Sequence, residues 1–374
     1  MTAQEAFGDA SFNVERYLSN RPRYPEQLYR LLRDYYRPSV QGRSKDAVLL
    51  DLGCGPGFAA FPLLNDFPGG LIGVDTSKGM VQAAPSALQS WLASTSTDAS
   101  AAVPLAFDVS KASFVVGNSN ELKGVVSDDS IDVVIAATAA HWFEYGPTWR
   151  EMSRVVRPGG SVLWFTYAEH YMRDHPSLQR DIFEFMQGDA QGSIGPYFPQ
   201  PGRSLLTNLL KDVPFPNEIG GSHGLPDEML KQWDLASAVR HMHPMASDGH
   251  PDLSWLEQQR QQSSNATQQN EQSDEQPFRL EQRWTWAQYE SYIRTSSALH
   301  NYLKNHPQEQ QGQQQQQGGG DVASRFVERI RSKVLQQRRN GEAVSSSVER
   351  LSDDEVRIAW PLGLMAIRKK VRSP

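Results

Sequence analysis

The chain has 374 residues, of which 39% are hydrophobic and 21% are charged, a composition typical of globular proteins that excludes wholesale disorder. Its 37 basic and 43 acidic residues give a net charge of −6, so the chain as a whole does not attract nucleic acid or acidic membranes. At ~150 residues per domain, the length corresponds to about two domains, or to one domain with large additions. The single cysteine, Cys54, excludes an internal disulfide and predicts a reducing compartment.

The first residues lack the pattern of a signal peptide. Residues 1–11 include Glu5 and Asp9, whereas a signal peptide has basic and then apolar residues. No apolar run approaches the ~18 residues that cross a membrane. We therefore expect a cytoplasmic protein with no membrane partner, and the net charge predicts no nucleic-acid partner.

Short aliphatic runs alternate with amphipathic or turn-rich stretches in the first half of the chain. Helical stretches are predicted at 57–65 and 149–156, and Arg157-Pro158-Gly159-Gly160 predicts a turn. Repetition of strand, helix and strand predicts an α/β fold with a doubly wound, mostly parallel sheet, whose ligand crevice lies at the carboxyl ends of the strands. The predicted strands span residues 47–52, 71–74, 113–116, 131–137 and 161–166.

The second half of the chain is less regular. Three low-complexity stretches, at 93–102, 257–276 and 305–321, hold too few apolar residues to form a core and predict disordered insertions. Residues 355–368 predict a late strand that returns to the first sheet. Helices are predicted around 178–187, 203–211, 227–241 and 286–303. The predicted organisation is an N-terminal lid at 1–40, a Rossmann-like core at 41–180, an inserted cap at 181–304, a Gln/Gly linker at 305–321, and a C-terminal helix and strand at 322–374.

A glycine-rich string, Asp51-Leu52-Gly53-Cys54-Gly55-Pro56-Gly57, follows the first predicted strand. Glycines at these places let the backbone turn tightly and let a ligand approach without a Cβ atom in the way. The spacing is G-x-G-x-G, not the G-x-G-x-x-G of a pyrophosphate binder, and an acid precedes it. A carboxylate there repels a diphosphate but suits a cofactor with an ammonium and a sulfonium group, which favours S-adenosylmethionine.

Further candidates for cofactor binding follow the next two strands. Asp75 ends the second predicted strand, where its carboxylate can accept hydrogen bonds from two ribose hydroxyls or cap the following helix. Thr76 lies beside it, and Met80 either covers an adenine face or fills the core. After the third strand, Asn118 and Ser119 offer a side chain and a backbone amide to the adenine edge.

These motifs resemble those of class I S-adenosylmethionine-dependent methyltransferases. Asp51 to Gly57 correspond to the first motif of that family and Asp75 to its second acidic motif. The similarity continues through Asp132-Val133-Val134, Ala137 and Arg157-Pro158-Gly159-Gly160. The family usually has Asp where Asn118 stands, and Asn can still accept a hydrogen bond through its carbonyl oxygen. The resemblance implies a cofactor site made of Asp51, Gly53, Cys54, Gly55, Gly57, Asp75, Thr76, Met80, Asn118, Ser119 and Ala137.

The expected fold is therefore a Rossmann-like class I methyltransferase sheet, mostly parallel with an antiparallel late strand, with a helical N-terminal lid and an inserted cap. A narrower resemblance lies outside the cofactor half. NVERYLSNRPRYP at 13–25, His141-Trp142-Phe143, GPYFPQPGRS at 195–204 and YIRTSSA at 292–298 resemble the fungal trans-aconitate and cantharidin methyltransferase group. These relatives usually have Trp where Ser296 stands. The resemblance implies a small-molecule acceptor.

Arginines and aromatic residues in these segments are the candidates for acceptor binding. Arginine can pair with a carboxylate through two parallel hydrogen bonds, and tyrosine rings can form pocket walls. In the alternative interpretation, Arg-Pro-x-Tyr-Pro is a rigid connector whose arginines are solvated or pair with Glu15 and Glu26. The predicted acceptor-binding residues are Tyr17, Arg21, Tyr24, Tyr197 and Arg203.

His141 and Trp142 follow the fourth predicted strand and are the predicted catalytic residues. Histidine titrates near neutrality, so His141 can act as a base, or it can only shape the pocket. A carboxylate acceptor, with a pKa of about 4, is ionised at pH 7 and needs no base, whereas a hydroxyl acceptor does. We therefore expect O-methylation of a carboxylate on a small acid.

Three alternatives stay open at this point. One is O-methylation of a hydroxyl group with His141 as base, and the others are a catalytically silent S-adenosylmethionine-binding protein and an NAD-type oxidoreductase. We expect no metal site, because His241, His243 and His250 have no cysteine or tight carboxylate cluster beside them. The sequence leaves the oligomeric state undetermined.

Overall fold

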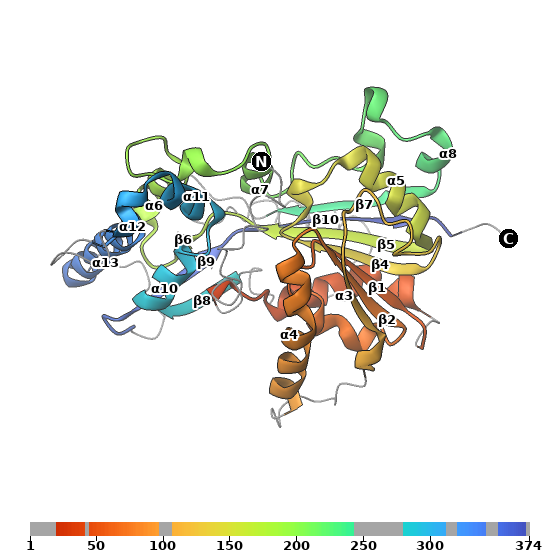
Figure 1. Ribbon diagram of the computed structural model, residues 1–374, viewed down its shortest axis with the longest axis horizontal. Coiled ribbons are helices and arrows are strands. Elements are labelled where there is room, and N and C mark those ends of the chain that lie inside the picture. The colour runs from red at the N-terminus through yellow and green to blue at the C-terminus, as the bar shows by residue number, and fades with distance from the viewer. Residues whose placement is uncertain are drawn as a thin grey trace, which may run out of the picture.

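The protein is built around a seven-stranded sheet and a smaller three-stranded sheet (Figure 1). The structure is a computed structural model, and it describes residues 20–41, 45–96, 107–242, 280–311, 320–341 and 351–371. The order of the large sheet is β3-β2-β1-β4-β5-β10-β7. Its strands are β1 Val48–Leu52, β2 Gly70–Asp75, β3 Ala112–Val116, β4 Ile131–Ala137, β5 Val156–Tyr167, β7 Trp233–Met242 and β10 Leu362–Lys369.

The first five strands pair in parallel, and β10 pairs antiparallel to both β5 and β7. Leu49 of β1, for example, lies between Leu71 of β2 and Val133 of β4. Strands buried on both faces are expected to be almost continuously aliphatic, as β4 is apart from Asp132. The arrangement confirms the predicted Rossmann-like sheet with an antiparallel late strand. It also places the carboxyl ends of the parallel strands at one edge.

Helices cover both faces of the large sheet (Figure 1). One face packs on α3 Glu26–Val40 and α4 Lys78–Ser96. The other packs on α5 Tyr145–Val155 and on the segment that contains α7 Gly202–Thr207 and α8 Asp227–Leu230. Short 3-10 helices are η1 Phe61–Asp66, η2 Val109–Lys111, η3 Ala140–Trp142, η4 Pro176–Leu178, η5 Gly195–Tyr197, η6 Pro216–Glu218 and η7 Gly221–His223.

Helix α3 lies within the segment 1–40 that the sequence predicts to be a lid. Leu28, Leu32 and Tyr36 recur every four residues and are fully buried against the sheet, so α3 is part of the core layer. Residues 1–19 lie outside the described residues. Within the predicted lid, residues 20–25 are therefore the only described residues that precede α3 and can border the site.

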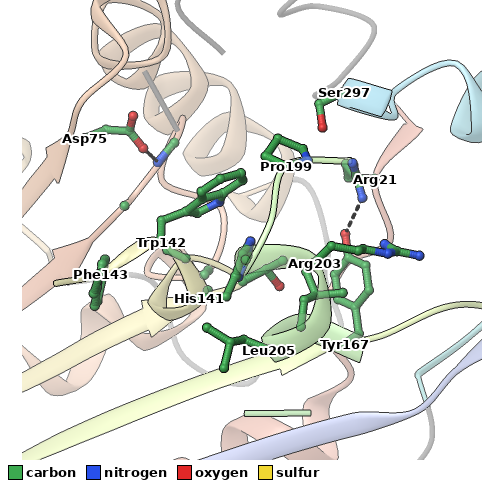
Figure 2. Close-up of a pocket in the computed structure, with 18 of the residues that line it drawn as sticks. Arg21, Asp75, His141, Trp142, Phe143, Tyr167, Pro199, Arg203, Leu205 and Ser297 are labelled. Atoms are coloured by element: carbon green, nitrogen blue, oxygen red, sulfur yellow. Dashed lines mark hydrogen bonds between the residues drawn. The ribbon is translucent and has the colours of Figure 1, made fainter. Parts of the chain in front are cut away.

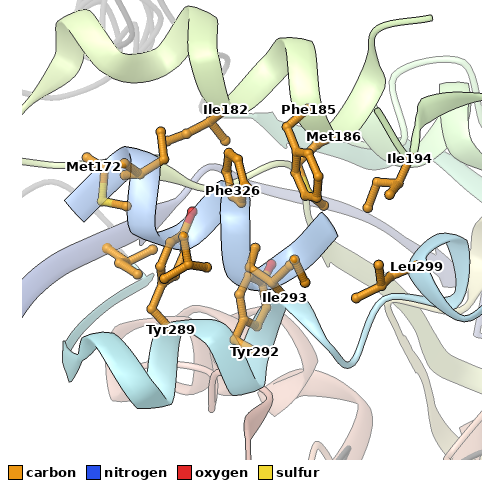
Figure 3. Close-up of a cluster of buried hydrophobic side chains, with 14 of the residues drawn as sticks. Met172, Ile182, Phe185, Met186, Ile194, Tyr289, Tyr292, Ile293, Leu299 and Phe326 are labelled. Atoms are coloured by element: carbon orange, nitrogen blue, oxygen red, sulfur yellow. The ribbon is translucent and has the colours of Figure 1, made fainter. Parts of the chain in front are cut away.

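The smaller sheet belongs to a second core, which we call the cap: residues 171–197, 280–311, 320–341 and 351–360 (Figures 1 and 3). Its centre is filled by aromatic and aliphatic side chains, with the Phe185 and Phe326 rings stacked at 3.9 Å between centroids. The cap strands are β6 Tyr171–Met172, β8 Leu280–Thr285 and β9 Glu355–Trp360, in the antiparallel order β6-β9-β8. The cap helices are α6 Gln179–Gln187, α10 Trp286–Ile293, α11 Ser297–Asn305, α12 Pro307–Gln311 and α13 Val322–Asn340.

The structure differs from the sequence prediction at the strands that complete the two sheets. The helix predicted at 227–241 ends at Leu230, and β7 follows, because pairing with β10 outweighs local propensity. The late strand predicted at 355–368 is two strands, of which β9 joins the cap and β10 joins the large sheet. Pro361 lies between them, where the chain changes sheets.

Four smaller predictions also change. The helix predicted at 57–65 is replaced by turns and η1, and that predicted at 203–211 ends at Thr207, before Leu209 takes a left-handed backbone conformation with φ 55°. The predicted turn at 157–160 is an irregular beginning of β5. The predicted linker at 305–321 contains α12, while 312–319 and the stretch 257–276 lie outside the described residues.

No helix in the described part of the chain is both long enough and apolar enough to span a lipid bilayer.

We expect Phe326→Ala to lower the free energy of unfolding by about 3–5 kcal/mol, because it leaves a cavity beneath Phe185 in the cap core. Urea denaturation followed by tryptophan fluorescence measures this loss. Phe183→Ala is the matched control, since Phe183 is 49% exposed on α6, and we expect a change within about 0.5 kcal/mol. Equal losses in the two variants would contradict the assignment of Phe326 to a packed core.

Candidate cofactor and acceptor site

A cavity of about 570 Å³ opens at the carboxyl ends of the parallel strands, between the large sheet and the cap (Figure 2). Its floor comes from the loops after β1, β2, β3 and β4. Residues 21–24, the loop at 198–201 with the following helix α7, the end of α10 and the beginning of α11 form its walls. A cavity at this edge is where parallel α/β sheets bind their ligands.

The glycine loop bends over the end of β2. Backbone N–H groups of Gly53 and Cys54 both donate to the Val74 carbonyl oxygen, at 2.7 and 3.1 Å. Gly55 has φ +51°, a left-handed conformation that favours glycine, and a Cβ atom built on it would meet nothing within 4 Å. The backbone of Gly55 therefore faces open space in the cavity, as a ligand-binding turn requires.

Asp75 lines the cavity at the end of β2, as predicted. Its Oδ2 accepts a hydrogen bond from the Gly55 N–H at 2.8 Å (Figure 2). Its Oδ1 accepts one from the Ser77 N–H at 2.8 Å. Burial raises the pKa of Asp75, and these two backbone donors oppose that rise. Each carboxylate oxygen can accept a second hydrogen bond, so the fixed carboxylate can still bind a ribose hydroxyl.

The other predicted cofactor residues divide into two groups. Those that line the cavity are Gly53, Cys54, Gly55, Asp75, Thr76, Met80, Asn118, Ser119 and Ala137. Gly57 lies outside the lining and has φ +94°, so it shapes the turn. The Ser119 hydroxyl is 3.0 Å from the Thr148 hydroxyl, which ties the loop after β3 to α5.

Asp51 is fully buried and does not line the cavity, although the sequence predicts a direct role in holding the cofactor. Its neighbours within the sheet, Gly73 and Ile135, enclose it. Neither carboxylate oxygen has a hydrogen-bond partner among the described residues. Burial, together with the charge of Asp75, raises the pKa of Asp51 to about 8. A cation bound at this end of the cavity would favour the charged form of both acids, so the pair favours a positively charged ligand.

His141 and Trp142 lie midway along the cavity, between Asp75 and the residues of the opposite end (Figure 2). The two rings are 5.0 Å apart between centroids. Burial, with a smaller contribution from the nearby Arg203 guanidinium, lowers the pKa of His141 to about 3. The imidazole is therefore neutral at physiological pH.

Arg21 and Tyr24, two of the predicted acceptor-binding residues, line the opposite end of the cavity. The Arg21 guanidinium donates to the Tyr167 hydroxyl at 3.1 Å and to the Thr295 carbonyl oxygen at 3.3 Å. The Tyr24 hydroxyl is 2.6 Å from the Thr138 hydroxyl, directly after β4. The segment before α3 is thereby joined to both the large sheet and the cap.

Arg203 also lines this end, but its guanidinium pairs with a carboxylate that the sequence analysis did not identify. It donates to Glu169, whose other oxygen lies 2.7 Å from Nδ1 of His170. Nε2 of His170 in turn lies 2.7 Å from the Tyr289 hydroxyl. Burial alone would raise the pKa of Glu169, but Arg203 and His170 outweigh it and hold that pKa at about 2.

Two predicted acceptor residues are not placed in the cavity. Tyr197 does not line it, because its ring packs against Tyr302 and His306 in the cap, at 5.2 and 5.8 Å between centroids. Tyr17 lies outside the described residues. Four further residues at this end were not among the predicted acceptor-binding residues. Tyr167 and Glu169 lie at and just after the end of β5 without a recognisable motif, whereas Tyr292 and Ser297 lie within the YIRTSSA segment at 292–298.

The sheet order, the left-handed glycine turn and the fixed carboxylate after β2 together define the fold of class I S-adenosylmethionine-dependent methyltransferases. The antiparallel β10 between β5 and β7 distinguishes it from the dinucleotide-binding sheet of NAD-type oxidoreductases, whose order is 3-2-1-4-5-6. S-adenosylmethionine is the cofactor that these residues fit. The cavity is open beside Gly55, and two buried acids, Asp51 and Asp75, favour the positive charge of this cofactor.

Comparison with known proteins agrees with this class. Residues 50–164 match the family model described as "Methyltransferase domain". The "probable S-adenosylmethionine-dependent methyltransferase CRG1" of Saccharomyces cerevisiae is 23% identical over 198 residues, which cover 53% of this chain and 60% of that protein. "Methyltransferase ptaI" of Pestalotiopsis fici is 21% identical over 226 residues, with coverage of 57% and 62%. The chain thus spans about three fifths of the length of these relatives.

A solved structure described as a type II methyltransferase from Anaeromyxobacter dehalogenans has a similar fold. Its TM-score is 0.51 at 18% identity, and the match covers 94% of this chain and 99% of that one.

We expect Asp75→Asn to weaken S-adenosylmethionine binding by about 10- to 100-fold, because hydrogen bonds to a charged group contribute about 1.5–3 kcal/mol. Isothermal titration calorimetry measures the Kd. The exposed Asp108 lies before β3 and outside the cavity, so Asp108→Asn is the control and leaves the Kd unchanged. An unchanged Kd in Asp75→Asn would exclude a ribose contact by this residue.

We expect Asp51→Asn to reduce the loss of stability that accompanies rising pH. The pKa of Asp51 is about 8 in the folded state, whereas its ordinary value is 3.8. Its contribution to the free energy of unfolding is therefore fully present below about pH 4 and is lost as the pH rises through about 8. Urea denaturation at about pH 5 and about pH 9 compares the variant with the wild type. Asp46→Asn changes an exposed acid before the same strand and keeps the wild-type dependence. An identical dependence in Asp51→Asn would contradict the raised pKa.

Proposed function

We propose that the chain is an S-adenosylmethionine-dependent methyltransferase that methylates a carboxylate oxygen of a small organic acid. The end of the cavity opposite Asp75 is called the acceptor end, and the observation that carries the proposal is the set of residues that line it. Two arginines, Arg21 and Arg203, border it, while the histidine at its centre has a pKa of about 3. Such a site can hold an anion but offers no base near neutrality.

The chemistry requires little proton transfer. S-adenosylmethionine supplies a methyl group on a positively charged sulfur. A carboxylate with a pKa of about 4 is already ionised at pH 7, so it is a nucleophile without help from a base. The remaining task of the protein is to align the acid, and such positioning is worth about 7–11 kcal/mol of the barrier. Trp142 and His141 shape the middle of the cavity and exclude water from the reacting groups.

The relatives support the class of reaction, since both are described as methyltransferases. Their names do not specify a carboxylate acceptor, so that part rests on the acceptor end alone. The resemblance of residues 13–25 and 195–204 to small-molecule methyltransferases points the same way.

O-methylation of a hydroxyl group is the second candidate, because His141 lines the cavity and is neutral. A base whose conjugate acid has a pKa of about 3 takes a proton inefficiently from a phenol with a pKa of about 10. The low pKa of His141 therefore favours the carboxylate.

We expect methyl esters to form when the full chain is incubated with S-adenosylmethionine and a panel of mono-, di- and tricarboxylic acids, alongside phenols. Mass spectrometry with a trideuterated methyl donor detects the transfer. Products from phenols alone would replace the proposal by hydroxyl methylation. Tight cofactor binding without any product would indicate a catalytically silent protein.

With an acid that is methylated, we expect His141→Ala to retain activity within about tenfold, since the carboxylate mechanism needs no base. His223→Ala, an exposed histidine outside the cavity, is the control. Loss of turnover in His141→Ala at every pH, with cofactor affinity intact, would show that a base is required.

A further inference from the structure

The beginning of helix α11 borders the acceptor end of the cavity. Thr295, Ser296 and Ser297 all line it and are 3%, 8% and 8% exposed. The helix runs for nine residues from Ser297, and the His300 N–H donates to the Ser296 carbonyl oxygen at 3.1 Å. Backbone N–H groups in the first turn of a helix have no acceptor within the helix, and they give that end a partial positive charge.

Ser296 has no hydrogen-bond partner for its buried hydroxyl among the described residues. Serine at the position before a helix usually caps it by accepting a bond from the first turn, but Ser296 makes no such bond. In Figure 2 the side chain of Ser297, the next residue, extends from α11 toward Pro199 and Arg21. A buried hydroxyl without a partner costs free energy, so a ligand that supplies the partner is favoured here.

The charges around α11 point to the kind of ligand. Arg21 donates to the carbonyl oxygen of Thr295, which places its guanidinium beside the positive end of the helix. The carboxylate of Glu169 also lines this end of the cavity, and it is already engaged by Arg203 and His170. The Arg21 guanidinium and the partial positive charge at the beginning of α11 therefore lie beside each other, and an anion is the ligand that complements both.

We propose that Ser296, Ser297, the first-turn N–H groups of α11 and Arg21 form a subsite for an anionic group of the acceptor, a carboxylate in the simplest case. The inference rests on the proposed function and extends it to a specific binding position. In Figure 2, Ser297 lies on the other side of Trp142 from Asp75.

Isothermal titration calorimetry of the full chain, saturated with S-adenosylhomocysteine, tests the subsite with succinate as the probe. We expect succinate to bind the wild type, and the double variant Ser296→Ala/Ser297→Ala to bind it at least tenfold more weakly, since hydrogen bonds to a charged ligand are lost. Succinamide, its neutral diamide, binds neither protein. S-adenosylhomocysteine binds both proteins with the same Kd.

Ser193→Ala is the matched control, since Ser193 is also buried in the cap but its hydroxyl donates to the Gly188 carbonyl oxygen, away from the cavity. We expect this variant to be less stable and to bind succinate as the wild type does. Equal affinity of the wild type and the double variant for succinate, or succinamide binding as tightly as succinate, would overturn the subsite, as would no succinate binding at all. Succinate binding that depends on both serines, without methyl transfer to any acid, would refute the proposed function and leave the subsite standing.

Discussion

Parallel pairing of β1, β2, β4 and β5 is the constraint on which the site depends, because it brings the carboxyl ends of strands distant in sequence to one edge of the sheet. The hydrogen bond from the Gly55 N–H to Asp75 joins the loop after β1 to the end of β2. The Thr138 hydroxyl after β4 lies 2.6 Å from that of Tyr24. A shift of one residue in the register of any of these strands would turn such side chains to the other face of the sheet. The site is thus specified by the same aliphatic runs that form the core.

The cap closes the cavity that the large sheet leaves open. Loops at the end of a parallel sheet form the floor of a cleft, but the acceptor end is closed by the cap through Tyr292 and the beginning of α11. Contacts across the boundary are polar as well as apolar. Arg21, which precedes the first helix of the sheet layer, bonds to Thr295 in the cap, and Arg203 pairs with Glu169 close to where the chain enters it. These two charged links thus join segments from different parts of the chain that line the same cavity.

The cofactor half is predictable from the sequence because its residues are set by local geometry. Asp75 ends an aliphatic strand and Gly55 sits in a tight turn, and both properties are visible in a few neighbouring residues. The acceptor half is not predictable in this way. Tyr197 belongs to a motif that resembles other methyltransferases, yet its ring packs against Tyr302, more than a hundred residues along the chain. Glu169 has no motif, and only the folded chain brings it to Arg203. The same holds for β7, whose strand conformation depends on its pairing with β10.

The position of Pro361 has a consequence for the order of folding. β9 forms the centre of the cap sheet and β10 lies inside the large sheet, and one proline separates them. During synthesis, the segments that precede residue 355 can collapse. The large sheet still lacks the strand between β5 and β7, and the cap sheet lacks the strand between β6 and β8, until residues 355–369 emerge. The two cores are therefore completed almost together, by long-range contacts, which is a topology associated with slow folding and exposed strand edges in the nascent chain. A chain interrupted after α13 would lack a central strand in both sheets.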